Sequence, residues 1–308
     1  MQPLLHIGYH KTATTWLQEH VFVNAKAGFY RVVRPEVLQL SFARINAFGF
    51  EPEVVREEFE PGIREAQAHN LVPVLSAERL SGSPHSGGHD SKIIADRLVA
   101  VFPMARVLVV IREQASMLVA LYKQYVKMGG PGSLQQYVTA PPGDHRVPLF
   151  RFDFLEYHRL IGYYQGLFGV TNVLVLPYEL VQTQPQDFLE RIGQFLGVSA
   201  TDSEFRRVHV SQSALTLSLK RHANRYVVQD ALNPAPPFAL DGSNETLVRL
   251  CNQADRRIPV ALRSGHERRW RRSAEREVGT RYAQSNALTA KLIGIDLRAF
   301  GYAWEPSR

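Results

Sequence analysis

The stretch Leu4–Gln18, LLHIGYHKTATTWLQ, contains the features that decide the fold. A short apolar run leads into Gly8, and one lysine and three threonines follow before a helix-like segment begins at Trp16. The first amides of a helix lack intrahelical partners and carry partial positive charge, so a strand-to-helix turn of this composition is typical of a phosphate-binding loop. We therefore expect residues 10–16 to hold a phosphate group.

Further short apolar segments predict the rest of the sheet. The four segments expected as strands are Leu4–Gly8, Leu71–Ser76, Arg106–Ile111 and Asn172–Leu176. Unbroken apolar runs indicate strands buried on both faces, as in a parallel sheet. The segments with a helical pattern are Trp16 onward, Glu53–Asn70, Asp90–Phe102, Ala115–Met128, Phe154–Phe168 and Pro185–Leu196. This alternation predicts an α/β protein built as a three-layer sandwich around a central parallel sheet.

Two stretches rich in proline and glycine suggest the domain organisation. Ala140–Pro148, APPGDHRVP, is typical of an exposed loop, and Asn233–Asn244 separates the α/β part from a tail with helical periodicity over Glu245–Ala290. We expect a single domain over residues 1–308, with a core of about residues 1–232 and a helical C-terminal extension over about residues 245–308.

The overall charge favours anionic ligands. The chain has 308 residues, a net charge of +7 and a sequence pI near 9.6. The densest basic run is Arg263–Arg272, RSGHERRWRR, which is interpreted either as a solvated helix face or as a patch for an anionic acceptor. We do not expect nucleic acid as a partner, because the sequence has no zinc-finger spacing, RNP-like motif or recognition-helix pattern.

Cysteine content and hydropathy suggest a compartment. Cys251 is the only cysteine, which excludes an internal disulfide and a cysteine-rich metal site and fits a reducing environment. Apolar runs such as Val107–Ile111 and Val173–Leu176 are too short to span a bilayer, and the first residues show no signal-peptide pattern. A cytoplasmic location is the expectation.

The loop differs from the GxxxxGK[ST] pattern of nucleotide triphosphatases. Only two residues separate Gly8 from Lys11, and no second glycine precedes the lysine. The expected strand Arg106–Ile111 runs into Arg112, where a magnesium-dependent enzyme would have an acidic residue. Both features argue against magnesium-dependent chemistry.

Four segments in order resemble the sulfotransferase family. The residues HIGYHKTATTWLQ resemble its 5′-phosphosulfate loop, a strand followed by K-[TS]-G-[TS]-[TS]. Arg106–Tyr125 is similar to its 3′-phosphate element, and Asn172–Leu180, NVLVLPYEL, to the segment that borders the adenine. Arg281–Trp304 resembles the end of bacterial members, although we assign it no chemistry. The resemblance, closest to bacterial carbohydrate-type members, implies a P-loop NTPase-like fold.

The resemblance also implies a reaction. Family members move a sulfuryl group from 3′-phosphoadenosine 5′-phosphosulfate (PAPS) to an acceptor, here a hydroxyl on a carbohydrate or glycolipid-like molecule. A sulfuryl group carries a single negative charge, so no metal is expected. Lys11 is expected to meet the charge that builds on the leaving phosphate oxygen. The expected donor-binding residues are His10, Lys11, Thr12, Ala13, Thr14, Thr15, Trp16, Arg112, Ala120 and Tyr178.

Two positions depart from the family pattern. Ala13 stands where the family often has glycine, and we expect the helix start to accept its Cβ. Ala120 stands where a serine hydroxyl would reach the 3′-phosphate, so another group must bind this phosphate together with Arg112. Ser116 lies one turn earlier on the same helical face.

The general base has three candidates. Glu78 follows an expected strand, as a glutamate does in carbohydrate sulfotransferases, and its alternative role is an ion pair with Arg79 or another nearby basic residue. His85 and His89 are the rivals, in a loop interpreted as an acceptor lid or a surface loop. A histidine base would make activity rise with pH around 6.5.

Other interpretations remain open at this point. Lys220, Arg221 and Arg225 share one face of a helical segment and would either close over the donor or face solvent. A nucleotide-type kinase is one alternative function. A non-catalytic protein that binds an anionic nucleotide or polysaccharide is another, and Ala120 favours it.

Overall fold

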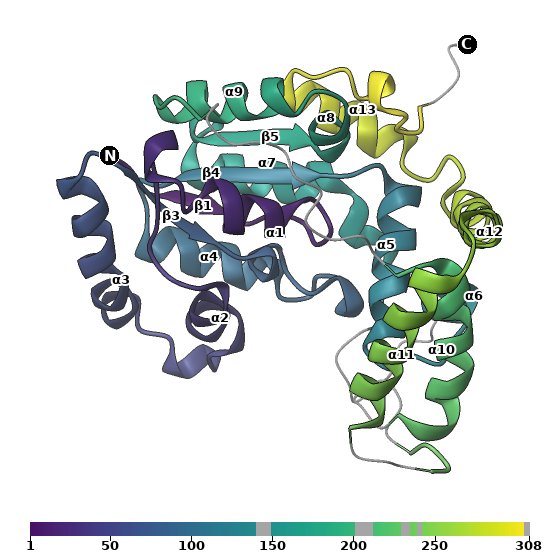
Figure 1. Ribbon diagram of the computed structural model, residues 1–308. Helices are drawn as coiled ribbons and strands as arrows, with labels where there is room; N and C mark the ends of the chain where they lie inside the picture. Colours follow the sequence, from purple (N-terminus) through teal and green to yellow (C-terminus); the bar gives the residue numbers. More distant parts are fainter. Residues whose placement is uncertain (140–148, 201–211, 229–234, 239–241, 305–308) are drawn as a thin grey trace. The chain divides into compact units, whose positions relative to one another are not determined.

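The computed structural model describes residues 1–139, 149–200, 212–228, 235–238 and 242–304 (Figure 1). The chain divides into two compact units. The first comprises Met1–Glu113, Phe152–Val208 and Thr280–Arg308, and the second comprises Gln114–Arg151 and His209–Gly279. The organisation as one domain stays a prediction.

The first unit is built on a parallel sheet. Its strands in the described residues are β1 (Leu4–His6), β2 (Phe29–Arg31), β3 (Val72–Ser76), β4 (Arg106–Ile111) and β5 (Val173–Pro177). They lie in the order β2-β3-β1-β4-β5, and every pair is parallel. The central strand β1 is held between two neighbours, since Leu4 pairs with Val74 of β3 and with Arg106 of β4.

The four strands predicted from apolar runs are confirmed, whereas β2 was not predicted. β2 has three residues, Phe29–Arg31, and only the first of them is fully buried. Its short, partly polar sequence carries no strand pattern. It forms because its backbone extends the edge of the sheet beside β3, with Phe29 opposite Val72.

Helices cover the sheet on both sides (Figure 1). The α-helices of the first unit are α1 (Thr14–Trp16), α2 (Pro35–Leu38), α3 (Pro52–Ala68), α4 (Ser91–Val101), α7 (Tyr157–Phe168), α8 (Tyr178–Thr183), α9 (Pro185–Leu196) and α13 (Ala283–Ile293). In the view of Figure 1, α1 lies in front of the strands, and α4 and α7 lie behind them. The predicted central sheet flanked by helices is therefore confirmed.

The helix expected from Trp16 onward differs in its geometry. Thr14–Trp16 form one α-helical turn, and Leu17–Val21 continue it as a π-helix. The side chain of Trp16 is buried with Phe188 of α9, and their ring centroids are 6.4 Å apart. This packing fixes the start of the helical segment against one face of the sheet, directly after the loop.

The second unit is helical. It contains α5 (Gln114–Lys127), α6 (Leu134–Val138), α10 (Ala214–Val227), α11 (Ser243–Arg257) and α12 (Val260–Val278), and α10 packs against α5, α11 and α12. Lys220 of α10 is buried, and its Nζ donates to Oδ1 of Asn224 at 2.8 Å and of Asn244 at 2.6 Å. Of the two alternatives for Lys220, the solvated face is therefore wrong, because the ammonium is bonded inside the helical unit. Arg225 is exposed.

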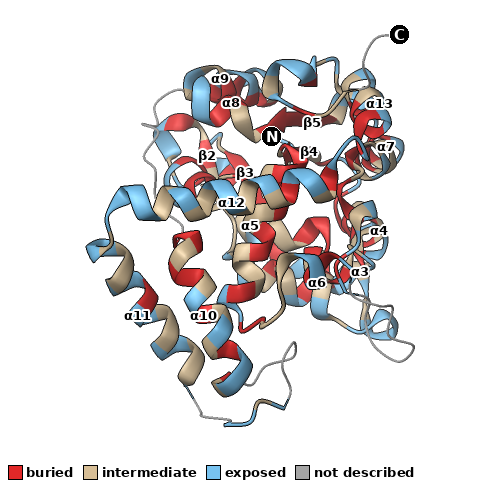
Figure 2. Ribbon diagram, turned by 90° about the vertical axis from the view of Figure 1, so that its right-hand side faces the viewer, coloured by how far each residue is buried: buried red, intermediate tan, exposed pale blue. Residues whose placement is uncertain are grey.

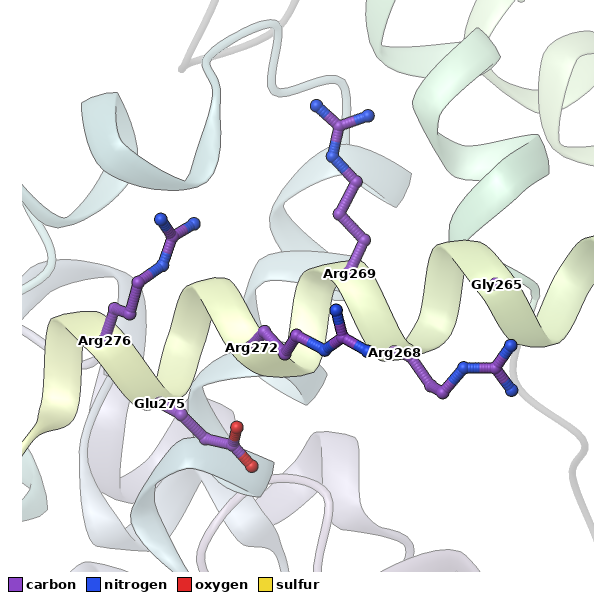
Figure 3. Close-up of a pocket in the computed structure, with 6 residues that line it drawn as sticks. All are labelled: Gly265, Arg268, Arg269, Arg272, Glu275 and Arg276. Carbon is purple, nitrogen blue, oxygen red and sulfur yellow. The ribbon is translucent and has the colours of Figure 1, made fainter.

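Helix α12 carries most of the basic run. Its inward side packs in the unit, where the Trp270 ring lies 4.8 Å from that of Tyr122 and the Glu267 carboxylate pairs with Lys123 at 2.8 Å. Four exposed arginines line a shallow pocket on the other side (Figure 3), and they are Arg268, Arg269, Arg272 and Arg276. These outward arginines fit the interpretation as a solvated helix face.

Burial follows the predicted layers (Figure 2). Apart from the edge strand β2, the strands of the sheet are buried along almost their whole length, whereas α11 and α12 show exposed positions on every turn. In the described residues, no helix combines the length and apolar character that crossing a bilayer requires. The predicted loop Ala140–Pro148 lies outside the described residues, as do residues 233–234 and 239–241 of the second proline- and glycine-rich stretch.

Candidate active site

The carboxyl ends of four neighbouring strands bring the predicted site residues to one edge of the sheet. β1 leads into Gly8 and the loop, β3 leads to Glu78, β4 to Arg112 and β5 to Tyr178. Parallel strands end at the same edge, where ligands of open α/β sheets bind. Residues far apart in the sequence thus surround one place in the first unit.

The loop begins as an extension of β1. The backbone N–H of Tyr9 donates to the carbonyl of Val110 in β4 at 3.2 Å. Gly8 then turns with φ +53°, and a Cβ on it would lie 3.3 Å from Thr14 Oγ1 and 3.5 Å from Glu78 Cα. Glycine is required here because the loop folds back onto its own helix and onto the residue that follows β3.

Two non-glycine residues of the loop adopt left-handed backbone conformations. Lys11 has φ 66° and Ala13 has φ 63°. The helix start accommodates the Cβ of Ala13 in a left-handed conformation, which costs a side chain about 1–2 kcal/mol. The conformation is held by the carbonyl of Ala13, which accepts the N–H of Leu17 at 3.1 Å.

The threonine hydroxyls of the loop have different environments. Thr12 is buried, and its Oγ1 donates to the carbonyl of Tyr9 at 2.5 Å, so it stabilises the turn itself. Thr14 Oγ1 is also buried, but finds no hydrogen-bond partner among the residues that the structure describes. A buried hydroxyl without a partner costs about 1–3 kcal/mol. Thr14 therefore suits an oxygen-rich ligand such as a phosphate, which would accept a hydrogen bond from its hydroxyl. Thr15 is half-buried.

Arg112 connects the loop to the end of β5. Its Nη1 donates to the carbonyl of Lys11 at 3.0 Å, and its guanidinium carbon lies 4.7 Å from the centre of the Tyr178 ring. The Tyr178 hydroxyl accepts from Gln182 Nε2 at 3.3 Å. The structure thus brings together three residues that the sequence assigned to the 5′-phosphate, the 3′-phosphate and the adenine.

Glu78 does not form the ion pair that sequence reasoning gave as its alternative role. Arg79 pairs with Asp90, whose Oδ1 also accepts the N–H of Ser83 at 3.0 Å. Burial alone would raise the pKa of Asp90, but the hydrogen bonds from Arg79 and Ser83 outweigh it and lower the pKa. Glu78 is half-buried at the start of the 3₁₀ turn Glu78–Ser81, next to Gly8.

The histidines of the site differ in their surroundings. Burial lowers the pKa of His10 to about 3, with further lowering by His85, Lys11 and Arg79. Burial and Lys11 lower the pKa of His85 to about 4. Both rings therefore lie close to the Lys11 ammonium and are neutral at pH 7. The lowered pKa of His85 therefore predicts that a base at this position would leave activity flat around pH 6.5.

His89 and its loop are held by local contacts. His89 is exposed, and its Nδ1 bonds Ser86 Oγ at 3.1 Å. Ser91 Oγ donates to the carbonyl of Ser81 at 2.8 Å, and a Cβ on Gly88 would lie 2.3 Å from the Phe154 ring. The segment expected as a lid or a surface loop is therefore packed in place.

The buried histidines should make folding sensitive to acid. Because the pKa values of His6, His10 and His85 are lowered to about 3, 3 and 4, the unfolded chain binds more protons than the folded chain below pH 6.5. Stability should therefore fall as the pH is lowered from 6.5 to 5. Between pH 6.5 and 5, the free energy of unfolding of a His10→Gln variant should fall by about 1.5 kcal/mol less than that of the wild type. Urea unfolding at both pH values measures the difference, and equal losses would contradict the burial of His10.

Contacts beneath and beside the loop were missed by sequence reasoning. Ser76 Oγ bonds His6 Nδ1 at 2.7 Å and accepts from Gln18 Nε2 at 3.1 Å, which ties the ends of β1 and β3 to the helix after the loop. Glu179 Oε1 accepts the N–H of Glu113 at 3.0 Å. The polar residues at these strand ends were visible in the sequence, but their partners are distant in the chain.

Ser116 and Ala120 lie on α5 in the second unit, and their assignment to the donor stays a prediction. The described residues contain no group of three or more histidine, cysteine, aspartate or glutamate side chains arranged to hold a metal ion. The absence of a metal from the reaction also stays a prediction.

Comparison with known sequences decides the family. The sequence model of the sulfotransferase domain matches residues 2–225. The chain belongs to the sulfotransferase family. The matched residues include the loop, Glu78, Arg112 and Tyr178, whereas α11, α12, α13 and the C-terminal segment lie beyond the match. No curated protein sequence matches the chain.

Two solved structures are similar to this chain to different degrees. A sulfotransferase from Alicyclobacillus acidocaldarius is 14% identical, with a TM-score of 0.51 over 72% of this chain and 94% of that one. The sulfotransferase domain of the olefin synthase of Synechococcus PCC 7002 is 12% identical, with a TM-score of 0.42 over 81% of this chain and 94% of that one. The first similarity confirms the predicted P-loop-like α/β fold.

Proposed function

We propose that this sulfotransferase uses PAPS as its donor and a hydroxyl group of a carbohydrate or glycolipid-like molecule as its acceptor. The observation that carries the proposal is the convergence of Lys11, Thr14, Arg112 and Tyr178 at the carboxyl ends of β1, β4 and β5. A cationic loop, an arginine and an aromatic ring suit the 5′-phosphosulfate, the 3′-phosphate and the adenine of this donor, respectively.

The residues present fit the donor. The unpartnered hydroxyl of Thr14 and the left-handed turns at Lys11 and Ala13 suit a loop that wraps an anion. Arg112 presents a planar guanidinium, which can hold a phosphate with two parallel hydrogen bonds. His10, Thr12, Thr15 and Trp16 contribute to the shape of the loop.

The proposed reaction requires the protein to stabilise negative charge on the departing phosphate and to remove a proton from the acceptor hydroxyl. PAPS supplies the sulfuryl group, which leaves its phosphate and forms a bond to the acceptor oxygen. Lys11 is exposed at the tip of the loop, where its ammonium can follow negative charge on the departing phosphate. Glu78 lies beside Gly8, and its carboxylate would take the proton of the acceptor hydroxyl.

A carbohydrate-type acceptor is supported by the position of Glu78. In carbohydrate sulfotransferases a glutamate follows the matching strand. Here Glu78 follows β3, and Arg79 forms its ion pair with Asp90 instead of with Glu78. His85 is the rival base, because it lies close to Lys11 and is neutral, and so able to accept a proton, at pH 7.

The donor assignment predicts a preference between two nucleotides. 3′-Phosphoadenosine 5′-phosphate (PAP) should stabilise the protein against heat more than AMP does, because only PAP offers a 3′-phosphate to Arg112. Arg112→Gln should remove most of this difference. Arg191→Gln, which removes an exposed arginine paired with Asp187 on α9, should keep it. Equal thermal shifts for PAP and AMP with the wild type would contradict a 3′-phosphate site at Arg112.

A further inference from the structure

The C-terminal segment, which lies beyond the family match, reaches the residue next to Tyr178. After α13, Gly301 turns the chain with φ 79°, and the buried Tyr302 donates its hydroxyl to Glu179 Oε2 at 3.2 Å. Asn286 Nδ2 of α13 donates to the carbonyl of Ala303 at 2.9 Å, which fixes the segment to its own helix. Tyr302 is therefore held in a defined position against Glu179.

The other oxygen of Glu179 accepts a hydrogen bond from the peptide unit that follows Arg112. Oε1 accepts the N–H of Glu113 at 3.0 Å, and the Tyr157 hydroxyl donates to the carbonyl of Arg112 at 2.5 Å. These two groups are the N–H and the C=O of the same peptide unit. That unit is thus held from both sides, at the point where β4 ends.

The electrostatics agree with this geometry. Burial raises the pKa of Glu179, while the N–H of Glu113, the charge of Arg112 and the hydroxyl of Tyr302 all favour its ionised form. Its carboxylate accepts a hydrogen bond on each oxygen, whereas an amide in its place would offer only one acceptor oxygen.

Tyr178, the residue before Glu179, contacts the side chain of Arg112. Tyr178 lies against the Arg112 guanidinium at 4.7 Å, and Glu179 holds the peptide that follows Arg112. Both come from the first turn of α8, so one short segment fixes the backbone and the head group of Arg112 together.

We infer that Glu179 is a positioning residue for Arg112, and that Tyr302 of the C-terminal segment completes this arrangement. The segment thereby contributes to recognition of the donor's 3′-phosphate without contacting the donor. This inference rests on the proposed function, in which Arg112 binds that phosphate.

The test compares the affinities for PAP and AMP by calorimetry. Glu179→Gln keeps the size of the side chain but loses one of two acceptors, and we expect affinity for PAP to fall about tenfold, the usual worth of one hydrogen bond to a charged group. Affinity for AMP should stay unchanged. Tyr302→Phe removes only a hydroxyl, so the fold is kept, and a fall of about threefold for PAP alone is expected.

A matched control separates positioning from general loosening of the fold. Tyr282→Phe removes another buried tyrosine hydroxyl, which donates to the carbonyl of Phe152 at 2.8 Å and has no link to Glu179. It should leave both affinities unchanged. Suppose that the wild type prefers PAP, and that Glu179→Gln either keeps the full preference or loses affinity for PAP and AMP equally. The inference about Glu179 is then wrong, while the proposed donor site stands. A wild type without any preference for PAP would contradict the proposed donor site and the inference together.

Discussion

Replacing Lys11 with alanine should lower turnover by about two orders of magnitude or more, the usual effect of removing a donor that stabilises transition-state charge. Lys11 stands in a left-handed conformation at the tip of the loop, and its carbonyl is held by Arg112 at 3.0 Å. Because that backbone contact remains in the variant, binding of the donor should suffer less than turnover. Initial rates at saturating PAPS measure the effect.

Lys26→Ala is the control for Lys11→Ala, since Lys26 is another exposed lysine of the first unit, on the 3₁₀ turn Ala25–Ala27. It should have normal turnover. Near-normal turnover of Lys11→Ala at saturating donor would show that Lys11 has no role in the transition state.

Replacing Glu78 with glutamine should lower turnover about a hundredfold, in line with the usual contribution of a general base. The amide keeps the shape of the side chain beside Gly8 but cannot take a proton. Donor affinity should change little. Rates with one accepted substrate, together with PAP binding, measure both quantities.

His85→Ala and His89→Ala decide between the candidate bases. A pH profile cannot separate Glu78 from His85, because burial and Lys11 lower the pKa of His85 to about 4. His85→Ala should therefore be compared directly, and His89→Ala, at an exposed position bonded to Ser86, should be close to wild type. A fully active Glu78→Gln protein alongside an inactive His85→Ala protein would transfer the role of base to His85.

Local patterns in the sequence were sufficient to predict the layers of the fold. Buried parallel strands need unbroken apolar runs, and Arg106–Ile111 and Val173–Pro177 have them. β2 has no such run, because a three-residue edge strand is specified by its pairing with β3 rather than by its own residues. The π-helix after Trp16 likewise depends on packing against the core.

The site was predictable where one segment contains both the motif and its geometry, as in the loop around Lys11. Contacts between distant segments were not predictable. The bond from Arg112 to the carbonyl of Lys11 and the bond from Tyr302 to Glu179 each join residues more than a hundred positions apart. The conformation of Ala13 was not predictable for a different reason. The loop imposes a left-handed conformation on it, which alanine itself disfavours.

The most direct test of the proposed function is transfer from sulfur-labelled PAPS to a panel of carbohydrate and glycolipid hydroxyl acceptors, with ATP and magnesium as the competing donor system. The proposed function predicts labelled acceptor and released PAP in the presence of a chelator, with the Lys11→Ala protein as the inactive control. Transfer of the terminal phosphate of ATP that stops when the chelator is added, without any reaction of PAPS, would contradict it.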